Sequence, residues 1–229
     1  MIKRYTMFMA GVIASALGIS LITKAGLGTS PVTSPAFVLT FLFPYSLGTF
    51  TMMVNTGMFV LQAAILGRDF ERVQLLQLPA ALLFSACIDG WSRLFSFWPV
   101  HSYLSSAIVL AAGCVFLGLG IAFEVVPDVL ILPGEGLVRA IVRRFNLHFG
   151  HVKRAFDLVL VLAAGILSLA ATGKVLGIRE GTVAAALVVG PISHFFIGRI
   201  NAFARGENPV PESLNCLVEH EEESGAANL

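Results

Sequence analysis

Two short segments hold most of the residues that could do chemistry in this otherwise apolar chain. Residues 24–35 contain two glycines, two prolines and four hydroxyl residues, and residues 124–135 contain three acidic residues and two prolines. Non-helical backbone at membrane depth persists only where protein encloses it or where it lines a watery cavity. A half-helix that begins after each segment would aim free N–H groups and a partial positive charge at a common site. Thr33 and Glu135 take matching places in the two first turns.

We expect this site to bind a substrate. We expect Glu135 to bind the coupling ion or a charged group of the substrate. We expect Thr33 to form a neutral hydrogen bond with the substrate. Two alternatives remain open: Glu135 can simply favour the positive end of its own helix, and Asp157 can form a structural ion pair with Lys153 or Arg154. The full set of predicted substrate-binding residues is Gly28, Thr29, Thr33, Asn55, Pro133, Glu135 and Asp157.

Other polar residues have simpler interpretations. Glu124 and Asp128 flank Pro127 at a predicted helix end, and two alternatives are open for them, solvated caps or groups that line a cavity. Asp89 and Arg93 are four residues apart, which favours an ion pair on one helix. The cysteines show no spacing typical of a metal site or a disulfide, so neither is expected.

The elements that must position these residues are membrane helices. Hydrophobic residues make up 56% of the 229 and charged residues 13%, and the mean hydropathy is +0.84, which indicates an integral membrane protein. A spanning helix needs about 20 mostly apolar residues. Six segments qualify: 5–23, 48–66, 76–95, 103–123, 151–171 and 181–197. Two shorter elements, 32–43 and 134–145, read as half-helices.

The chain also aligns with itself. An offset of 102 residues pairs Gly11 with Gly113, Leu17-Gly18-Ile19 with Leu119-Gly120-Ile121, Pro31 with Pro133, Gly48 with Gly150 and Asn55 with Asp157. An offset of 104 then pairs residues 80–88 with 184–192. This pattern predicts two membrane repeats, 1–100 and 101–204, followed by a disordered cytoplasmic tail, 205–229. Duplication of this kind is typical of transporters, whose sites lie where the repeats meet.

The fold class predicted is an all-α polytopic membrane protein whose two repeats each contain three transmembrane helices and a half-helix. Three spans per repeat make the repeats inverted and place most basic residues on the cytoplasmic side together with both termini. The alternative has eight spans and parallel repeats, and it sends Arg68 and Arg72 outward. The residues placed inside by the first arrangement are Lys3, Arg4, Arg68, Arg72, Arg139, Arg143, Arg144, Lys153, Arg154, Arg199 and Arg205.

A family resemblance rests on four short motifs. The chain contains Leu27-Gly28-Thr29-Ser30-Pro31, Leu47-Gly48-Thr49, Gly181-Thr182 and Gly190-Pro191, and their order and spacing resemble the YczE/YitT-like group of bacterial integral membrane proteins. The resemblance covers nearly the whole chain before the tail. It implies a protein of the bacterial plasma membrane and assigns no substrate. That group typically has Leu-Gly-x-x-Pro-Trp-Asp, whereas Val32-Thr33 follows Pro31 here, so the acid is expected from Glu135 in the second repeat.

The motif content favours transport. The sequence lacks a Walker A loop, a His-Glu-x-x-His run and a Gly-x-Ser-x-Gly elbow. We therefore expect no enzyme activity and no cofactor, and nothing indicates nucleic-acid binding. The leading hypothesis is a secondary carrier for a small organic solute, coupled to protons or another ion. The expected partners besides the solute are membrane lipids and a second copy of the chain. The alternative is a non-transporting scaffold that holds a membrane-bound partner through its acidic tail.

Overall fold

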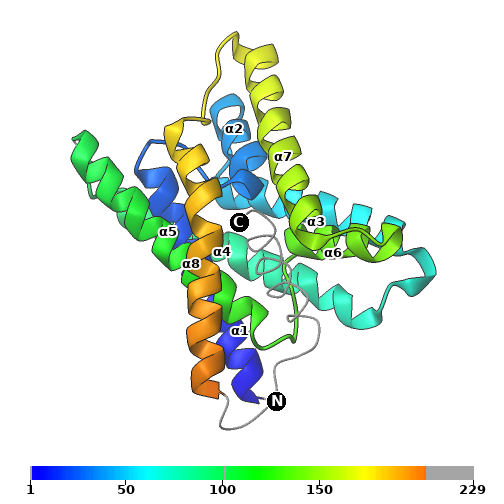
Figure 1. Ribbon diagram of the computed structural model, residues 1–229. Coiled ribbons are helices and arrows are strands. Elements are labelled where there is room, and N and C mark those ends of the chain that lie inside the picture. The colour runs from blue at the N-terminus through cyan, green and yellow to red at the C-terminus, as the bar shows by residue number, and fades with distance from the viewer. Residues whose placement is uncertain (1, 101, 205–229) are drawn as a thin grey trace, which may run out of the picture.

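The computed structural model describes residues 2–100 and 102–204, and within these ranges every regular element is a helix (Figure 1). The predicted tail, 205–229, lies outside the described residues. The elements in chain order are α1 (Ile2–Lys24), η1 (Pro31–Thr33), α2 (Ser34–Leu42), α3 (Leu47–Leu66), η2 (Gly67–Asp69), η3 (Arg72–Leu76), α4 (Gln77–Phe95), α5 (Tyr103–Val125), α6 (Pro133–Phe145), α7 (Phe149–Thr172) and α8 (Glu180–Ala204).

The prediction of an all-α polytopic membrane protein is confirmed. Helices α1, α3, α4, α5, α7 and α8 are long and apolar enough to cross a bilayer. Helix α2 has 9 residues and α6 has 13, which at 1.5 Å per residue is too short to span the hydrocarbon core. The two predicted half-helices are therefore present as short helices.

Local sequence signals explain where several helices begin and end. Ser46 caps α3 by accepting a hydrogen bond from the Thr49 N–H, and Ser102 begins α5 with a capping box. Pro133 occupies the first position of α6, where its missing N–H costs nothing. Asn146 ends α6 in the left-handed conformation, which asparagine tolerates better than most residues.

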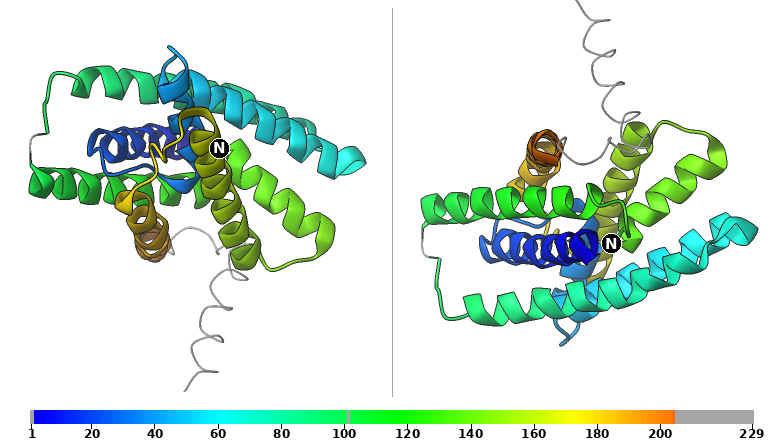
Figure 2. Two further views of the ribbon diagram at one scale, coloured as in Figure 1. Left: turned by 90° about the horizontal axis from the view of Figure 1, so that it is seen from above. Right: turned by 90° about the horizontal axis from the view of Figure 1, so that it is seen from below.

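Helices α1 and α5 form the centre of the fold, and glycines allow them to cross closely. A Cβ atom added to Gly11 would lie 2.8 Å from the Gly120 carbonyl oxygen, and one added to Gly18 would lie 2.8 Å from the Gly113 oxygen. Because the lower-numbered glycine of α1 meets the higher-numbered glycine of α5, the two helices are antiparallel. Figure 2 shows α1 flanked by α5 on one side and α4 on the other.

This antiparallel crossing favours one of the two predicted topologies. With six spans, α5 is the fourth crossing and runs opposite to α1, whereas with eight spans it would be the fifth and run parallel to α1. The observed direction is the one expected of six spans, which is also the number of long apolar helices among the described residues. The repeats stay a prediction.

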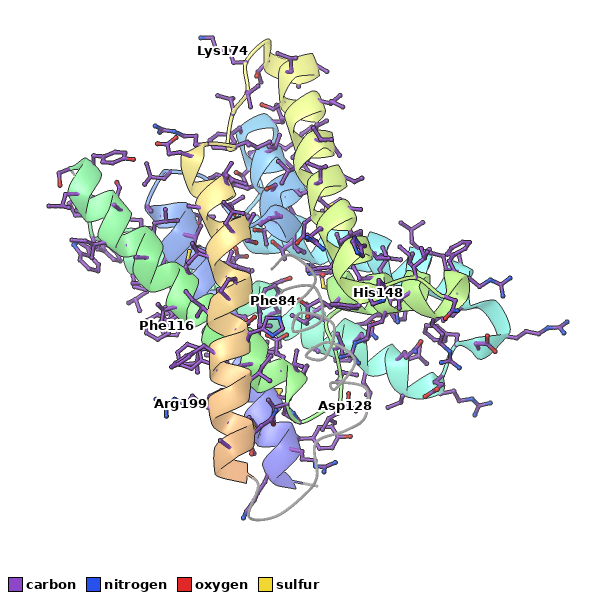
Figure 3. All side chains as sticks on the ribbon, viewed as in Figure 1. Phe84, Phe116, Asp128, His148, Lys174 and Arg199 are labelled. Atoms are coloured by element: carbon purple, nitrogen blue, oxygen red, sulfur yellow. The ribbon has the colours of Figure 1, made fainter. Side chains whose placement is uncertain are left out.

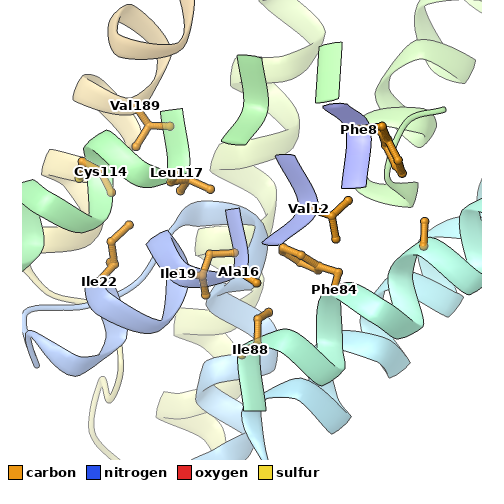
Figure 4. Close-up of a cluster of buried hydrophobic side chains, with 12 residues drawn as sticks. Phe8, Val12, Ala16, Ile19, Ile22, Phe84, Ile88, Cys114, Leu117 and Val189 are labelled. Atoms are coloured by element: carbon orange, nitrogen blue, oxygen red, sulfur yellow. The ribbon is translucent and has the colours of Figure 1, made fainter. Parts of the chain in front are cut away.

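An apolar cluster packs around the crossing. It draws side chains from α1, α4, α5 and α8, as Figure 4 shows. The labelled members are Phe8, Val12, Ala16, Ile19, Ile22, Phe84, Ile88, Cys114, Leu117 and Val189. These four helices form the core against which the rest of the molecule is arranged.

The short helices join the two halves of the chain. Helix α2 packs against both α3 and α7, and α6 packs against both α7 and α3. Helix α4 packs against α1, and α8 packs against α5. Helix α4 also packs extensively against α3, the long helix that precedes it in the chain. Among the described residues, α7 and α8 share no comparable interface.

Candidate functional site

A buried carboxyl group lies in the α1–α5 crossing. Glu124, in the last turn of α5, is 3% exposed, and the Ser15 hydroxyl donates a hydrogen bond of 2.6 Å to its Oε1 atom. Gly11 makes room for it, because a Cβ at Gly11 would approach the Glu124 Cγ to 2.9 Å. Glu124 is thus enclosed by protein, which is incompatible with the solvated-cap alternative for this residue. Asp128, labelled in Figure 3, lies in the connection from α5 to α6, and its side chain, 37% exposed, pairs with Arg139.

The depth of Glu124 follows from its partner. Ser15 lies near the middle of α1, whose span covers Lys3–Lys24. The backbone of Glu124 is at the end of the α5 span, Tyr103–Val125, but its carboxyl group contacts Ser15 beside the middle of α1. Ionisable groups at such depth are costly and usually serve a function.

A second acidic residue lies nearby without a cationic partner. Glu135, in the first turn of α6, is close enough to Glu124 for the two carboxyl groups to interact electrostatically. Neither takes part in an ion pair within the described residues. The ion pairs found there are Arg139–Asp128, Arg143–Glu71, Lys153–Asp157 and Arg179–Glu180. Two carboxyl groups that form no ion pair among the described residues are therefore close together where α5 ends and α6 begins.

The start of α6 lies against the first half of the chain. Leu132 precedes Pro133 and provides no side-chain cap, so the first turn keeps donors free for another partner. A Cβ on Gly134 would lie 3.2 Å from Val32 of η1 and 3.6 Å from the Met58 sulfur of α3. The two predicted half-helix starts are thus neighbours, because η1 reaches α6.

Helix α3 presents a buried polar stripe to α6. Thr51, Asn55, Met58 and Gln62 are spaced by four, three and four residues, which places them on one helical face, and all four are buried. The predicted residue Asn55 is one turn from Met58 and so belongs to this face. Gln62 and, from α4, Gln77 both lie against Gly136.

The two glutamines were not predicted, and they carry unpaired oxygen atoms. Gln62 is 1% exposed and Gln77 is 4% exposed, and the Oε1 atom of each has no hydrogen-bond partner within the described part of the chain. Each such orphan acceptor costs about 1–3 kcal/mol. A sequence signal for Gln62 is its place on the same helical face as the predicted residue Asn55, whereas the sequence offers no such signal for Gln77.

The hydroxyl-rich segment is held by hydrogen bonds within itself and to α8, and its predicted role in substrate binding stays a prediction. The Thr33 hydroxyl lies 2.8 Å from that of Thr29 and 2.9 Å from that of Ser30, and the Thr29 N–H donates to the Thr182 hydroxyl of α8 at 3.1 Å. Gly28 adopts φ +131° against Thr182, a conformation open mainly to glycine. These groups satisfy one another and fasten the segment to α8, so they offer little to a ligand in this conformation.

Two further carboxylates hold structural positions. Asp157 pairs with Lys153 at 2.9 Å, which agrees with the structural alternative for this residue. Asp89 does not pair with Arg93; its two oxygens accept hydrogen bonds from the Ser46 hydroxyl at 2.6 Å and the Gly48 N–H at 2.8 Å. Asp89 therefore caps the positive end of α3, and the predicted pair with Arg93 is wrong.

The comparisons with known proteins give a family and no activity. No curated protein and no solved structure matches the chain. The model of one family, described as "Family of unknown function (DUF6198)", matches residues 2–198, and the resemblance to the YczE/YitT-like group stays a prediction. Because that match takes in the α1–α5 crossing, both half-helices and nearly all of α8, the chain belongs to the DUF6198 family.

Proposed function

We propose that this protein is a secondary transporter, coupled to protons or another ion, for a small organic solute in the bacterial plasma membrane. The observation that supports it most is the Glu124 carboxyl group, which is buried against the middle of α1 and accepts a hydrogen bond from Ser15. An apolar side chain would pack there at lower cost, so a carboxyl group at this position suggests work on a proton or a cation. Glu135, at the start of α6, is its expected partner in coupling.

Inverted repeats are part of this proposal, and the contacts support them. Exchanging the two halves with the offset of 102 turns the contact of Gly11 with Gly120 into that of Gly113 with Gly18, and both contacts are present. The same exchange turns α1 on α4 into α5 on α8, and α3 on α6 into α7 on α2. Inverted repeats around a central site are typical of secondary carriers.

One contact breaks this correspondence and suggests a mechanism. Helices α3 and α4 pack together, whereas their counterparts α7 and α8 do not share a comparable interface. Closing α8 on α7 while α4 leaves α3 would exchange the conformations of the two halves. Such an exchange gives the site access to the opposite side of the membrane, which is alternating access by rocking of one repeat against the other.

The orientation proposed has both termini in the cytoplasm, on the distribution of Lys and Arg. A single Cys placed at position 70, in a Cys-free background, should react with a membrane-impermeant maleimide only after the cells are opened. Labelling in intact cells would contradict the orientation.

Transport can be tested on purified protein in liposomes loaded with a pH-sensitive dye. We expect one class of a panel of amines, amino acids, sugars and carboxylic acids to drive a proton flux and to enter chemically unchanged. Glu124→Gln should abolish the coupled flux, because the amide keeps the shape but cannot release a proton. Glu71→Gln is the matched control, since the Glu71 side chain is 64% exposed and should be dispensable.

The alternatives predict other results. Unchanged flux in Glu124→Gln would remove this residue from the mechanism. A scaffold would move none of the solutes, and its cellular phenotype would be lost on deletion of the residues after Arg205. An enzyme would convert its substrate in detergent, where no gradient exists.

A further inference from the structure

We infer that Gln62, Gln77 and the first turn of α6 bind the protonated amine of the solute, an inference that rests on the proposed function. The site lies between α3, α4 and α6, and of the residues that the sequence predicted for substrate binding it includes only Pro133 and Glu135, both in the first turn of α6. It gives the solute a chemical class, a small organic cation with N–H donors.

The geometry places both amides at one point on α6. A Cβ added to Gly136 would lie 2.5 Å from Gln62 Oε1 and 3.2 Å from Gln77 Nε2. The two side chains come from different helices and converge where α6 has no side chain of its own. Two buried amides therefore pack against the backbone of α6 at this glycine, next to the free N–H groups of its first turn.

Each of the two glutamine side chains has an oxygen atom that lacks a hydrogen-bond donor within the part of the chain that the structure describes. Gln62 Oε1 and Gln77 Oε1 are buried acceptors with no donor among the described residues. Native proteins pair the great majority of buried polar atoms, and inside a bilayer no bulk water is available to do so. A ligand that brings N–H donors would satisfy both oxygens.

Charge favours a cation over a neutral donor. Glu124 and Glu135 lie in the same region, and neither belongs to an ion pair among the described residues. The nearest basic residue along α6, Arg139, is committed to Asp128 at 3.6 Å. A protonated amine would therefore find acceptors and compensating negative charge together. A metal ion is less suited, because the described residues contain no cluster of three metal-ligating His, Cys, Asp or Glu side chains.

The binding test uses the purified full-length protein in detergent, where no transport is needed. The melting temperature is measured against increasing ethylammonium, which has three N–H donors, and against tetramethylammonium, which has the same charge and no N–H donor. We expect a saturable rise with ethylammonium and none with tetramethylammonium, sodium or acetate. An equal rise with tetramethylammonium or sodium would overturn the inference, as would no rise with ethylammonium.

Substitutions separate a binding role from a structural one. Gln62→Leu and Gln77→Leu should weaken ethylammonium binding at least tenfold and leave the ligand-free melting temperature unchanged or raised, because each removes a buried acceptor without a partner. Gly136→Ala should weaken binding, because the added Cβ would collide with Gln62 Oε1 and displace the amide. Gly57→Ala, on the same helix as Gln62 but with nothing within 4 Å of an added Cβ, should bind as the wild type does.

Two outcomes would contradict the assignment at the level of these residues. A lower ligand-free melting temperature in both glutamine variants would show that the amides are structural, and unchanged binding in both would place the amine elsewhere. If the transport proposal fails while the binding site is correct, ethylammonium will bind but no solute will drive a proton flux. Proton-coupled flux of another solute without ethylammonium binding would leave transport standing and remove this site.

Discussion

Replacing Gly18 by Ala tests whether the α1–α5 crossing sets the geometry of the molecule. The new Cβ would lie 2.5 Å from the Leu117 nitrogen and 2.8 Å from the Gly113 oxygen. Both are backbone atoms of α5, so no side-chain rotation can relieve the contact. The shorter distance is about 0.9 Å below the 3.4 Å at which ordinary van der Waals contact begins, and the helices must separate or tilt by a similar amount.

The magnitude follows from two opposed effects. Overpacking of this kind destabilises the fold by about 1–3 kcal/mol. Alanine stabilises a helix interior by up to about 1 kcal/mol relative to glycine. We expect a net loss of about 1–2 kcal/mol, which for a chain of this size corresponds to a melting temperature lower by about 2–8 °C.

The assay is thermal unfolding of the purified protein in detergent, followed by tryptophan fluorescence. Gly57→Ala is the matched control, because an added Cβ there meets nothing within 4 Å, and it should melt at or above the wild-type temperature. Gly120→Ala, whose Cβ would meet the Ser15 backbone, should behave like Gly18→Ala. If Gly18→Ala has the same melting temperature as Gly57→Ala, the close crossing is refuted, and so is the antiparallel register derived from it.

Three further substitutions test other parts of the structure. Asp89→Ala should destabilise the protein by about 1 kcal/mol, since it removes the acceptor at the start of α3, and chemical denaturation should show less loss for Asp89→Asn. Gly28→Ala should cost more than 1 kcal/mol because its φ of +131° and its contact with Thr182 both exclude a side chain; a wild-type melting temperature would contradict this. Glu124→Ile should leave the melting temperature unchanged or raised, because a buried carboxyl group gives way to an apolar one, while coupled flux in liposomes is lost.

The spans could be predicted from the sequence because they depend on local composition. About 20 apolar residues in succession allow almost nothing but a membrane helix, and all six predicted segments are long apolar helices in the structure. The two half-helices could also be predicted from local sequence, because Pro31 and Pro133 mark where each begins. These features need no knowledge of which helix packs against which.

The candidate site was harder to predict because it depends on long-range contacts. Glu124 stands beside a proline near a helix end, a context that is typical of a solvated cap, and only the approach of Gly11 and Ser15 from α1 encloses it. Asp89 has an arginine four residues away but meets the start of α3 instead. Spacing within one helix could not reveal either contact.

The repeat offset makes the position of Glu124 more informative. Under the exchange of the two halves, Glu124 corresponds to Ile22 and Ser15 corresponds to Leu117, and these two apolar side chains pack in the central cluster. In the inverted-repeat arrangement proposed above, the crossing is thus built once with an apolar pair and once with a polar pair. Packing alone is served equally well by the apolar version, so stability does not account for the carboxyl group. The acid lies only in the half of the crossing nearer the N-terminus of α1, which would give the two sides of a transport cycle different affinities for a proton or cation.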